Sequence, residues 1–470
     1  MYLPFDIWQH IAQFIPHEIL WTLYSVNSAF FDLAMEERYR DVSFGPEDGD
    51  IMPNFVKLQD PVVASRVRSI YFRPTVFLAD GRSLANWVKR ALVRTDSNGG
   101  GPLIGSERKT LKQMSAAFDA IVDLRAFHLH CWPSDDSDTI HLSVPFIHAA
   151  FTCVGRSLRE LVLDASLEAL GCALNPSLIF TGLETLVIRF CKSYRLPPAV
   201  KVLRDTVIPF VNNHHSTLRT FDLAEPNFKV TVDFDVTALF FGMTHFLRLR
   251  KLLVGIPLNG PETIAFRRFL DLHKTQISHL EILNEHALSF YDGGPLFGLR
   301  HLVLAKPSFT PKYEKLISFL QMSGGYLTCL VLSDYQIGYN AALDVFPALS
   351  QCEMLQELFI RADLPDSYFL NLLAESLPNL YTVHLAVHRD DTSIRSLFGY
   401  DTDWRYPPVS KLRRLRIVVP NEISKKVVVQ CQYNFRVTFP GIHCTLVAPE
   451  PVVIPDDQGT GRVRVELNTV

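Results

Sequence analysis

Side chains that could do chemistry are scattered along this chain of 470 residues, and none of them stands in a catalytic spacing. His388, Arg389 and Asp390 have the letters of a kinase catalytic loop, but no Gly-rich phosphate loop or Asp-Phe-Gly motif accompanies them. The sequence contains no G-x-S-x-G nucleophile elbow, no P-loop, no dinucleotide fingerprint after a strand and no H-E-x-x-H zinc helix. We therefore expect a protein that is not an enzyme and needs no cofactor.

One cluster of residue types that bind metals occurs at His279, Glu281, Glu285 and His286. Alternation along a strand puts residues 279 and 281 on one face, whereas residues 285 and 286 fall in the following turn. Adjacent aspartates, which solvated loops commonly contain, stand at positions 135–136, 390–391 and 456–457. We predict no metal site from these patterns.

A six-residue phrase recurs along the chain and predicts a series of strands. Its strict form has Leu at positions one and four, and Leu, Ile or Val at position six. Strict copies are LRELVL (158–163), LETLVI (183–188), LRKLLV (249–254), LRHLVL (299–304), LTCLVL (327–332), LQELFI (355–360) and LRRLRI (412–417). Looser copies complete a period of about 29 residues, and segments with helical periodicity lie between the copies.

This alternation of strand and helix resembles the leucine-rich-repeat proteins. The resemblance implies an α/β fold, a horseshoe solenoid with parallel strands on the inner side and helices outside. The family's Asn or Cys after each strand is present only as Cys191, so the repeats are degenerate and their turn geometry stays open. An all-helical solenoid is the alternative fold.

Within each strand the leucines should point into the core, so the intervening residues should lie on the open face of the sheet. Our candidate target-binding residues on that face are Glu160, Asp164, Arg189, Asp222, Lys251, Glu357, Phe359, Arg361, Arg414 and Arg416, with His128, His130, His279, Glu281, His301 and His384 beside them. A polar face of mixed sign suits a protein or peptide partner better than nucleic acid, which favours a continuous basic stripe. For any single residue, a merely solvated position is the simpler interpretation.

Residues 1–44 are unusually rich in large apolar side chains. Ile7, Ile11, Phe14 and Ile15 form one stripe of a helix that Pro16 ends, and further apolar residues follow at helical spacing. A chain of about 40 residues is marginally stable alone and cannot bury so many large side chains. Another chain or the following domain must cover the surplus apolar surface.

The same segment resembles an F-box, the helical motif that binds the adaptor of SCF-type ubiquitin ligases. The resemblance rests on Leu3-Pro4, Asp6-Ile7, Phe14-Ile15, Val26-Asn27 and Phe30-Phe31. It implies a Skp-type adaptor as partner and, through it, cullin and RING subunits. The residues implied to bind the adaptor or to shape its site are Leu3, Pro4, Ile7, Ile11, Phe14, Ile15, Leu20, Leu23, Val26 and Phe30. A helical cap that seals the end of the repeats is the alternative.

Composition narrows the class of protein. Hydrophobic residues make up 48% and charged residues 20% of the chain, which excludes wholesale disorder. The formal net charge of −3 gives no broad attraction to nucleic acid or membrane, and no apolar run is long enough for a membrane span. Eight cysteines without a CxxC pair favour a reducing location inside the cell, in the cytoplasm or nucleus or both.

These observations predict four segments: an F-box at 1–44, a connector at 45–66, a degenerate leucine-rich-repeat domain at 67–448, and a disordered or loosely packed tail at 449–470. The predicted function is that of a non-catalytic substrate receptor in an SCF-type ubiquitin ligase. Its target protein is unknown, and neither nucleic acid nor membrane is expected as a partner. A scaffold protein with the same parts and no ubiquitin-ligase role is the alternative.

Overall fold

The computed structural model describes residues 4–12, 14–45, 52–74, 105–131, 137–155, 157–175, 177–191, 199–224, 236–256, 258, 261–283, 294–305, 313–362, 367–387, 411–418 and 443–447. The chain forms two compact units, and along the sequence the first gives way to the second between Leu218 and Arg219. Each unit is α/β and is described by itself.

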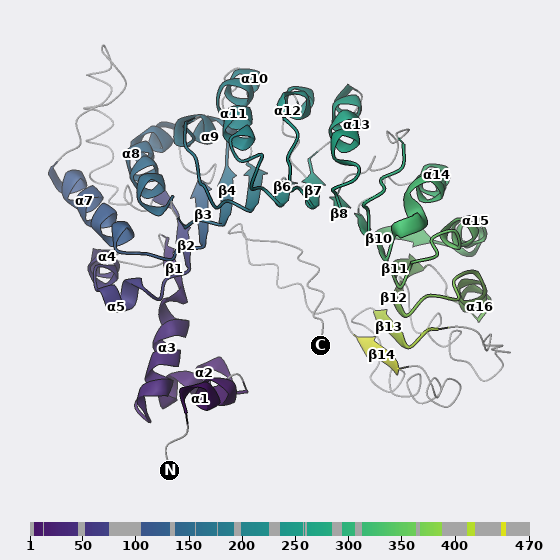
Figure 1. The fold of residues 1–470 in the computed structure, drawn as a ribbon, viewed down its shortest axis with the longest axis horizontal. Helices are drawn as coiled ribbons and strands as arrows, with labels where there is room; N and C mark the ends of the chain where they lie inside the picture. Colours follow the sequence, from purple (N-terminus) through teal and green to yellow (C-terminus); the bar gives the residue numbers. More distant parts are fainter. Residues whose placement is uncertain are drawn as a thin grey trace. The chain divides into compact units, whose positions relative to one another are not determined.

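The first unit opens with helices and continues with strands and helices in alternation (Figure 1). Its elements are α1 (Phe5–Ala12), α2 (His17–Leu20), the 3-10 helix η1 (Trp21–Leu23), α3 (Ser28–Arg40), β1 (Asp41–Phe44), α4 (Met52–Leu58), α5 (Pro61–Ala64), β2 (Ser69–Phe72), α7 (Gly105–Asp119), β3 (Ala126–Cys131), α8 (Ser137–Val154), β4 (Glu160–Ala165), α9 (Leu167–Ala173), β5 (Thr185–Phe190), α10 (Ala199–Val202), the π-helical turn η4 (Leu203–Val207) and α11 (Ile208–Asn212).

The second unit repeats the same alternation. Its elements are β6 (Thr220–Ala224), α12 (Val236–Gly242), β7 (Lys251–Gly255), α13 (Pro261–His273), β8 (His279–Ile282), β9 (His301–Leu304), α14 (Tyr313–Ser323), the 3-10 helix η5 (Gly324–Tyr326), β10 (Cys329–Ile337), α15 (Tyr339–Leu349), β11 (Glu357–Ala362), α16 (Ser367–Ser376), β12 (Thr382–Val387), β13 (Arg414–Val418) and β14 (His443–Val447). Helices α13 to α16 overlap segments that helical periodicity predicts between the repeated phrases, so that prediction is confirmed for them.

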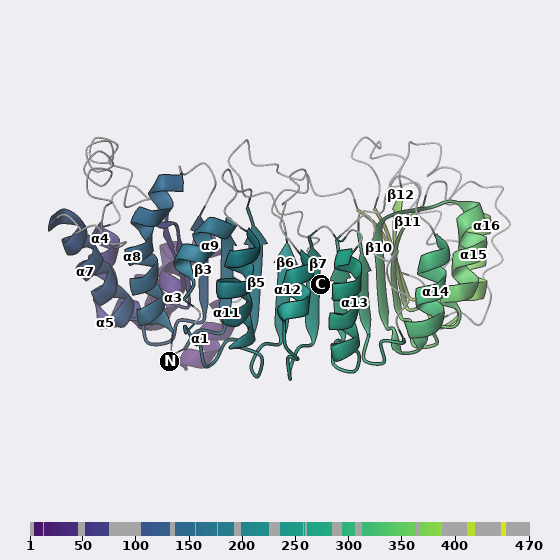
Figure 2. The same cartoon turned by 90° about the horizontal axis from the view of Figure 1, so that it is seen from above.

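Within each unit every strand pairs in parallel with the strands before and after it in the sequence, β1 to β5 in the first and β6 to β14 in the second. Consecutive parallel strands need a crossover connection, and the helices between strands supply it. Those helices cover one face of each unit's sheet, and none of the described helices between strands lies on the other face (Figures 1 and 2). The α/β class and the parallel strands are therefore confirmed, and the all-helical alternative is wrong.

Alternation along the strands explains which side chains form the core. In β3 the buried positions are Phe127, Leu129 and Cys131, and in β11 they are the second, fourth and sixth residues. Strand β4 buries five of its six residues, because Val162 and Asp164 on the other face are buried as well. The leucines of the repeated phrase thus point to the helix-covered side, as the sequence predicts.

Phenylalanine rings fill the space between strands and helices. In the first unit they form a continuous series of ring contacts, with centroids 4.7 to 6.5 Å apart, through Phe44, Phe55, Phe72, Phe118, Phe127, Phe151, Phe180 and Phe210. All eight are at most 2% exposed. Edge-to-face and offset aromatic pairs add stabilisation beyond the area that they bury.

Two buried histidines hold the turns that precede strands β5 and β7. His214 Nε2 accepts the N–H of Phe180 at 3.0 Å, and His273 Nε2 accepts the N–H of Phe246 at 2.9 Å. Their Nδ1 atoms lie 2.8 and 2.7 Å from the carbonyls of Phe210 and Phe269, so each ring donates there and is neutral. In the repeat after His273, Ser323 Oγ accepts the N–H of Leu296 at 3.2 Å in the same way.

Burial lowers the pKa of both imidazoles, that of His273 to about 4. A charged imidazole in this place would lose the acceptor that its turn requires. The hydrogen bonds and the lowered pKa values therefore agree on a neutral ring.

Some boundaries differ from the sequence-based expectation. The predicted connector at 45–66 contains α4 and α5, with Phe55 fully buried in the phenylalanine series. Asp41–Phe44, expected to end the F-box, forms β1 and pairs with β2. The predicted tail, 449–470, lies outside the described residues. In the part of the chain that the structure describes, no helix has the length and apolarity needed to cross a membrane.

Candidate docking and binding surfaces

The first candidate surface is built on helices α1 to α3. Pro4 precedes α1, and its carbonyl accepts the N–H groups of Ile7 and Trp8 at 3.1 and 3.3 Å. Asn27 caps α3, since its side-chain oxygen accepts the N–H of Phe30 at 2.8 Å. An Asn cap of this kind stabilises a helix by about 1 kcal/mol.

These helices share a very small core. Trp8 of α1 packs on Phe30 of α3 with ring centroids 5.1 Å apart, and Leu20, Ala29 and Ala34 are buried beside them. No residue of α1 is buried. Few side chains therefore hold α1 in place: Trp8, Ile11 and Ala12 are half-buried, and Phe5 and Ile7 are exposed.

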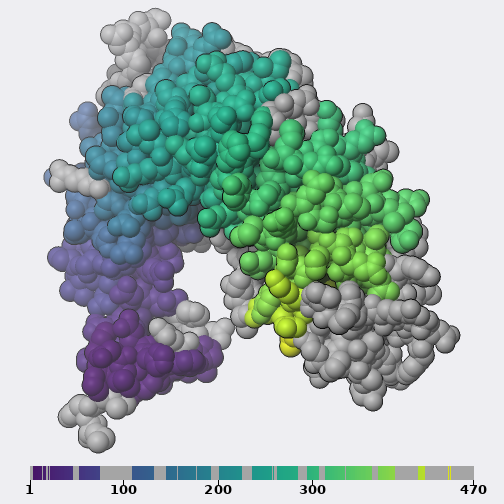
Figure 3. All heavy atoms as spheres, turned by 45° about the vertical axis from the view of Figure 1, so that its right-hand side comes forward, coloured from purple at the N-terminus to yellow at the C-terminus, as the bar shows by residue number. Residues whose placement is uncertain are grey.

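Large apolar side chains are exposed on these helices and in the turns between them. Between residues 4 and 31 they are Phe5 (50%), Ile7 (43%), Phe14 (76%), Ile19 (49%), Tyr24 (56%), Val26 (60%) and Phe31 (43%). We call this set the docking surface. In Figure 3 the purple atoms of this region lie at the bottom left, joined to the rest of their unit on one side. Large contiguous apolar patches on protein surfaces are typical of interaction sites, whereas apolar residues exposed singly are ordinary.

The predicted adaptor-binding residues divide into three groups. Pro4, Ile7, Phe14 and Val26 are exposed, Ile11, Ile15 and Leu23 are half-buried, and Leu20 and Phe30 are buried. Leu3 lies outside the described residues. Leu20 and Phe30 therefore shape the surface from beneath and present almost nothing to a partner.

Sequence reasoning left Phe5, Ile19, Tyr24 and Phe31 out of the candidate set. Phe5 lies on α1 off the predicted stripe, whereas Ile19 is on α2, Tyr24 is in the turn after η1 and Phe31 is on α3. For these positions, the large number of apolar residues in segment 1–44 was a better signal of exposure than their helical spacing.

A second candidate surface is the open face of the first unit's sheet. Register places His130, Asp164 and Arg189 side by side on β3, β4 and β5. Asp164 Oδ2 lies 2.9 Å from His130 Nδ1 and 3.0 Å from Arg189 Nη1. The other carboxylate oxygen, Oδ1, is buried and has no hydrogen-bond partner among the described residues.

Aromatic rings extend this group toward β2. Tyr71 stacks on His128 with centroids 4.3 Å apart, and His128 lies 6.4 Å from His130. Burial, together with the nearby His130 and Arg189, lowers the pKa of His128 to about 4, so its ring is neutral at pH 7. Tyr71 was not among the predicted face residues, although the loose phrase at 67–72 places it on this face.

A third candidate surface is the open face of the second unit's sheet. Phe359 of β11 and His384 of β12 stack with centroids 3.8 Å apart, and Arg416 of β13 follows them in register. Burial and the positive charge of Arg416 lower the pKa of His384 to about 4. Exposed Arg414 lies 6.0 Å from the ring of Tyr381, and Arg361 stands on the same face of β11.

The remaining candidates of the second unit lie on the earlier strands. Lys251 pairs in register with His279, which stacks on His301 at 5.6 Å, and Asp222 lies on the neighbouring β6. Glu281 Oε2 is 3.8 Å from His279 Nε2. Glu285 and His286 lie outside the described residues, and no group of three metal-binding side chains occurs among the described ones.

The structure thus separates the predicted target-binding residues into distinct groups. Glu160, Asp164 and Arg189 belong to the first unit, and the other seven belong to the second. Six cysteines are free thiols, namely Cys131, Cys153, Cys172, Cys191, Cys329 and Cys352.

Comparison with known proteins names no family. No protein-family model matches the chain, and no curated protein matches it. A solved structure of a Bacteroides fragilis protein aligns over 80% of this chain and 84% of its own, with 10% identity and a TM-score of 0.28. That likeness carries no argument about fold or function.

Proposed function

We propose that this chain is a non-catalytic substrate receptor of an SCF-type ubiquitin ligase. In this proposal residues 4–31 bind a Skp-type adaptor, and leucine-rich repeats present a target protein on the open faces of their strands. The observation that carries the proposal is the docking surface, seven large exposed apolar side chains on short helices and the turns between them, with almost no core of their own.

The resemblance of residues 1–44 to an F-box supports the adaptor as the occupant of that surface. Exposed Ile7, Phe14 and Val26 supply apolar contacts, and buried Leu20 and Phe30 set the angle between the helices that carry them. Buried apolar anchors of this type supply most of the affinity in protein interfaces.

Target binding is proposed for the open faces. The pair Phe359 and His384 offers a flat stacked surface flanked by Arg414 and Arg416, which suits a peptide with apolar and acidic side chains. The receptor itself breaks no bond in this proposal. It raises the effective concentration of target lysines near the ubiquitin-carrying enzyme.

Affinity purification with mass spectrometry tests the adaptor assignment. The variant Ile7→Asp/Phe14→Asp puts two charges on the docking surface and should lose the adaptor, cullin and RING subunits together. Val122→Asp/Ile179→Asp is the matched control, because those side chains are 78% and 57% exposed on the repeat region. Equal recovery of an adaptor by the two variants would remove the assignment.

Target turnover separates a ligase receptor from a scaffold. A target protein that co-purifies with the full chain should accumulate in cells where the Ile7→Asp/Phe14→Asp variant replaces the unmodified chain. Proteasome inhibition should raise the abundance of that target in the same way. A partner whose abundance responds neither to the variant nor to proteasome inhibition would favour a scaffold protein without a ubiquitin-ligase role.

A further inference from the structure

Arginine recurs at one structural position, the residue immediately before the strand. In the first unit it is Arg40 before β1, Arg68 before β2, Arg125 before β3 and Arg159 before β4. Arginine also precedes β6, β7, β9 and β13 in the second unit. We call the four residues of the first unit the arginine row.

Backbone hydrogen bonds hold the row in register. The carbonyl of Arg40 accepts the N–H of Arg68 at 2.8 Å, and that of Arg68 accepts the N–H of Arg125 at 2.8 Å. The carbonyl of Arg125 accepts the N–H of Arg159 at 2.9 Å. Neighbouring strands lie about 4.8 Å apart, so the four α-carbons span about 14 Å along the amino edge of the sheet.

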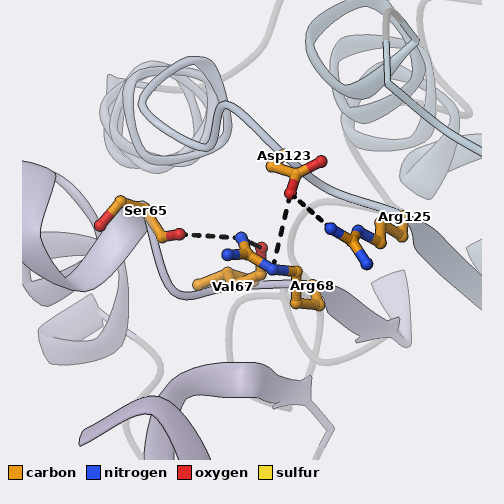
Figure 4. A network of polar contacts seen from close by, with 5 residues as sticks. All are labelled: Ser65, Val67, Arg68, Asp123 and Arg125. Carbon is orange, nitrogen blue, oxygen red and sulfur yellow. Dashed lines mark hydrogen bonds and ion pairs between the residues drawn. The ribbon is translucent and has the colours of Figure 1, made fainter. Parts of the chain in front are cut away.

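Two of the guanidinium groups are oriented by nearby acceptors (Figure 4). Asp123 Oδ2 lies 3.0 Å from Arg125 Nη2 and 3.6 Å from Arg68 Nε. Arg68 Nη1 also donates to the carbonyls of Ser65 and Val67, at 2.8 and 3.3 Å. The hydrogen bond from Arg125, with the charges of Arg125, Arg68 and Arg159, lowers the pKa of Asp123.

The charges of the row are not balanced. Asp123 is shared by Arg68 and Arg125, whereas Arg40 and Arg159 are exposed and form no ion pair among the described residues. Asp41 and Glu160 follow on the open face, and Glu184 takes the arginine's place before β5. Within the row, four evenly spaced guanidinium groups therefore stand against one bound carboxylate, that of Asp123, and Glu184 before β5 ends the series.

We propose that the arginine row binds an acidic, extended segment of another protein. Guanidinium groups pair with carboxylates in a planar, two-point geometry, and Asp123 already shows one carboxylate bound between two of them. About 14 Å corresponds to four or five residues of extended peptide, so a short run of Asp and Glu matches the row. Nucleic acid is disfavoured, because the chain has a net charge of −3 and Glu184 ends the row, which leaves no continuous basic stripe.

Binding of fluorescein-labelled octaglutamate to the full chain, measured by fluorescence anisotropy at low salt, tests the proposal. Arg125→Glu/Arg159→Glu should raise Kd at least about tenfold, since each substitution converts an attraction to a repulsion. Arg108→Glu/Arg204→Glu is the matched control with the same change of net charge on exposed helical arginines, and its Kd should stay within about twofold.

The proposal is wrong if the unmodified chain does not bind the peptide, or if the control variant loses as much affinity as Arg125→Glu/Arg159→Glu. It is also wrong if Arg125→Glu/Arg159→Glu, with unchanged thermal unfolding, binds the peptide as before. Tighter arginine-dependent binding of an oligouridylate of equal length would overturn it in favour of nucleic acid. The inference does not rest on the proposed adaptor function. Ile7→Asp/Phe14→Asp should bind the peptide normally, so failure of one idea leaves the other standing.

Discussion

The docking helices and the repeats use the same residue types in opposite ways. Phe14 is 76% exposed just after the first helix, whereas Phe127 is fully buried among Phe72, Phe118 and Phe151. The repeats stabilise themselves by stacking one core on the next, but α1 buries none of its residues. Among the described residues, the repeats thus close their own core, whereas the docking helices leave large apolar side chains exposed.

The same substitution in the two regions should have the most unequal effect. Phe127→Ala opens a cavity in the phenylalanine series and should lower the free energy of unfolding of its unit by about 3–5 kcal/mol. Phe14→Ala should change it by less than about 0.5 kcal/mol, because the ring contributes little burial. Chemical denaturation followed by circular dichroism measures both. Similar costs would contradict the distinction between the regions.

A pH dependence should appear in the repeats through His273. Its pKa is about 4 in the folded chain and 6.5 in the unfolded one, so below pH 6.5 the unfolded chain binds more protons. Stability should therefore fall as pH drops from about 6.5 to about 4, by about 3 kcal/mol for this residue. His273→Ser, which copies the arrangement at Ser323, should lower stability at pH 7 and flatten this slope. If stability depends on pH as steeply in His273→Ser as in the unmodified chain, the buried imidazole is not the cause.

The ion pair between Arg66 and Asp32 should set how firmly the docking helices are attached. Arg66 Nη2 lies 2.7 Å from Asp32 Oδ1, and Nη1 donates to the Asp32 carbonyl at 2.9 Å. Arg66→Ala should cost about 1–2 kcal/mol locally. Amide exchange should then accelerate in α3 and stay unchanged in β3 to β5. A uniform acceleration would show that the contact supports the whole unit.

The cap of α3 should give the smallest effect. Asn27→Ala removes the acceptor of the Phe30 N–H and should cost about 1 kcal/mol of helix stability, whereas Asn27→Asp should retain most of it. Adaptor affinity should fall severalfold in the alanine variant, because the angle between the helices is less well defined. Equal adaptor affinities of the Asn27→Ala and Asn27→Asp variants would show that the helix cap does not contribute to adaptor binding.

Much of the repeat architecture was predictable, because a periodic leucine pattern reports directly on strand alternation. The turn chemistry was not. His214 and His273 hold the turns before β5 and β7, and only spatial proximity relates them to Phe180 and Phe246. The open-face assignments followed from alternation, whereas burial at Asp164 and Asp222 depends on neighbouring strands. In the docking region, spacing could not tell buried Leu20 from exposed Phe14.

Hydrogen–deuterium exchange of the full chain with and without a Skp-type adaptor tests the central claim most directly. The account predicts slowing of at least about tenfold within residues 4–31 on adaptor binding, with exchange in β3 to β5 unchanged. The account is contradicted if amide exchange in residues 4–31 of the free chain is already as slow as exchange in β3 to β5 and the adaptor does not change it.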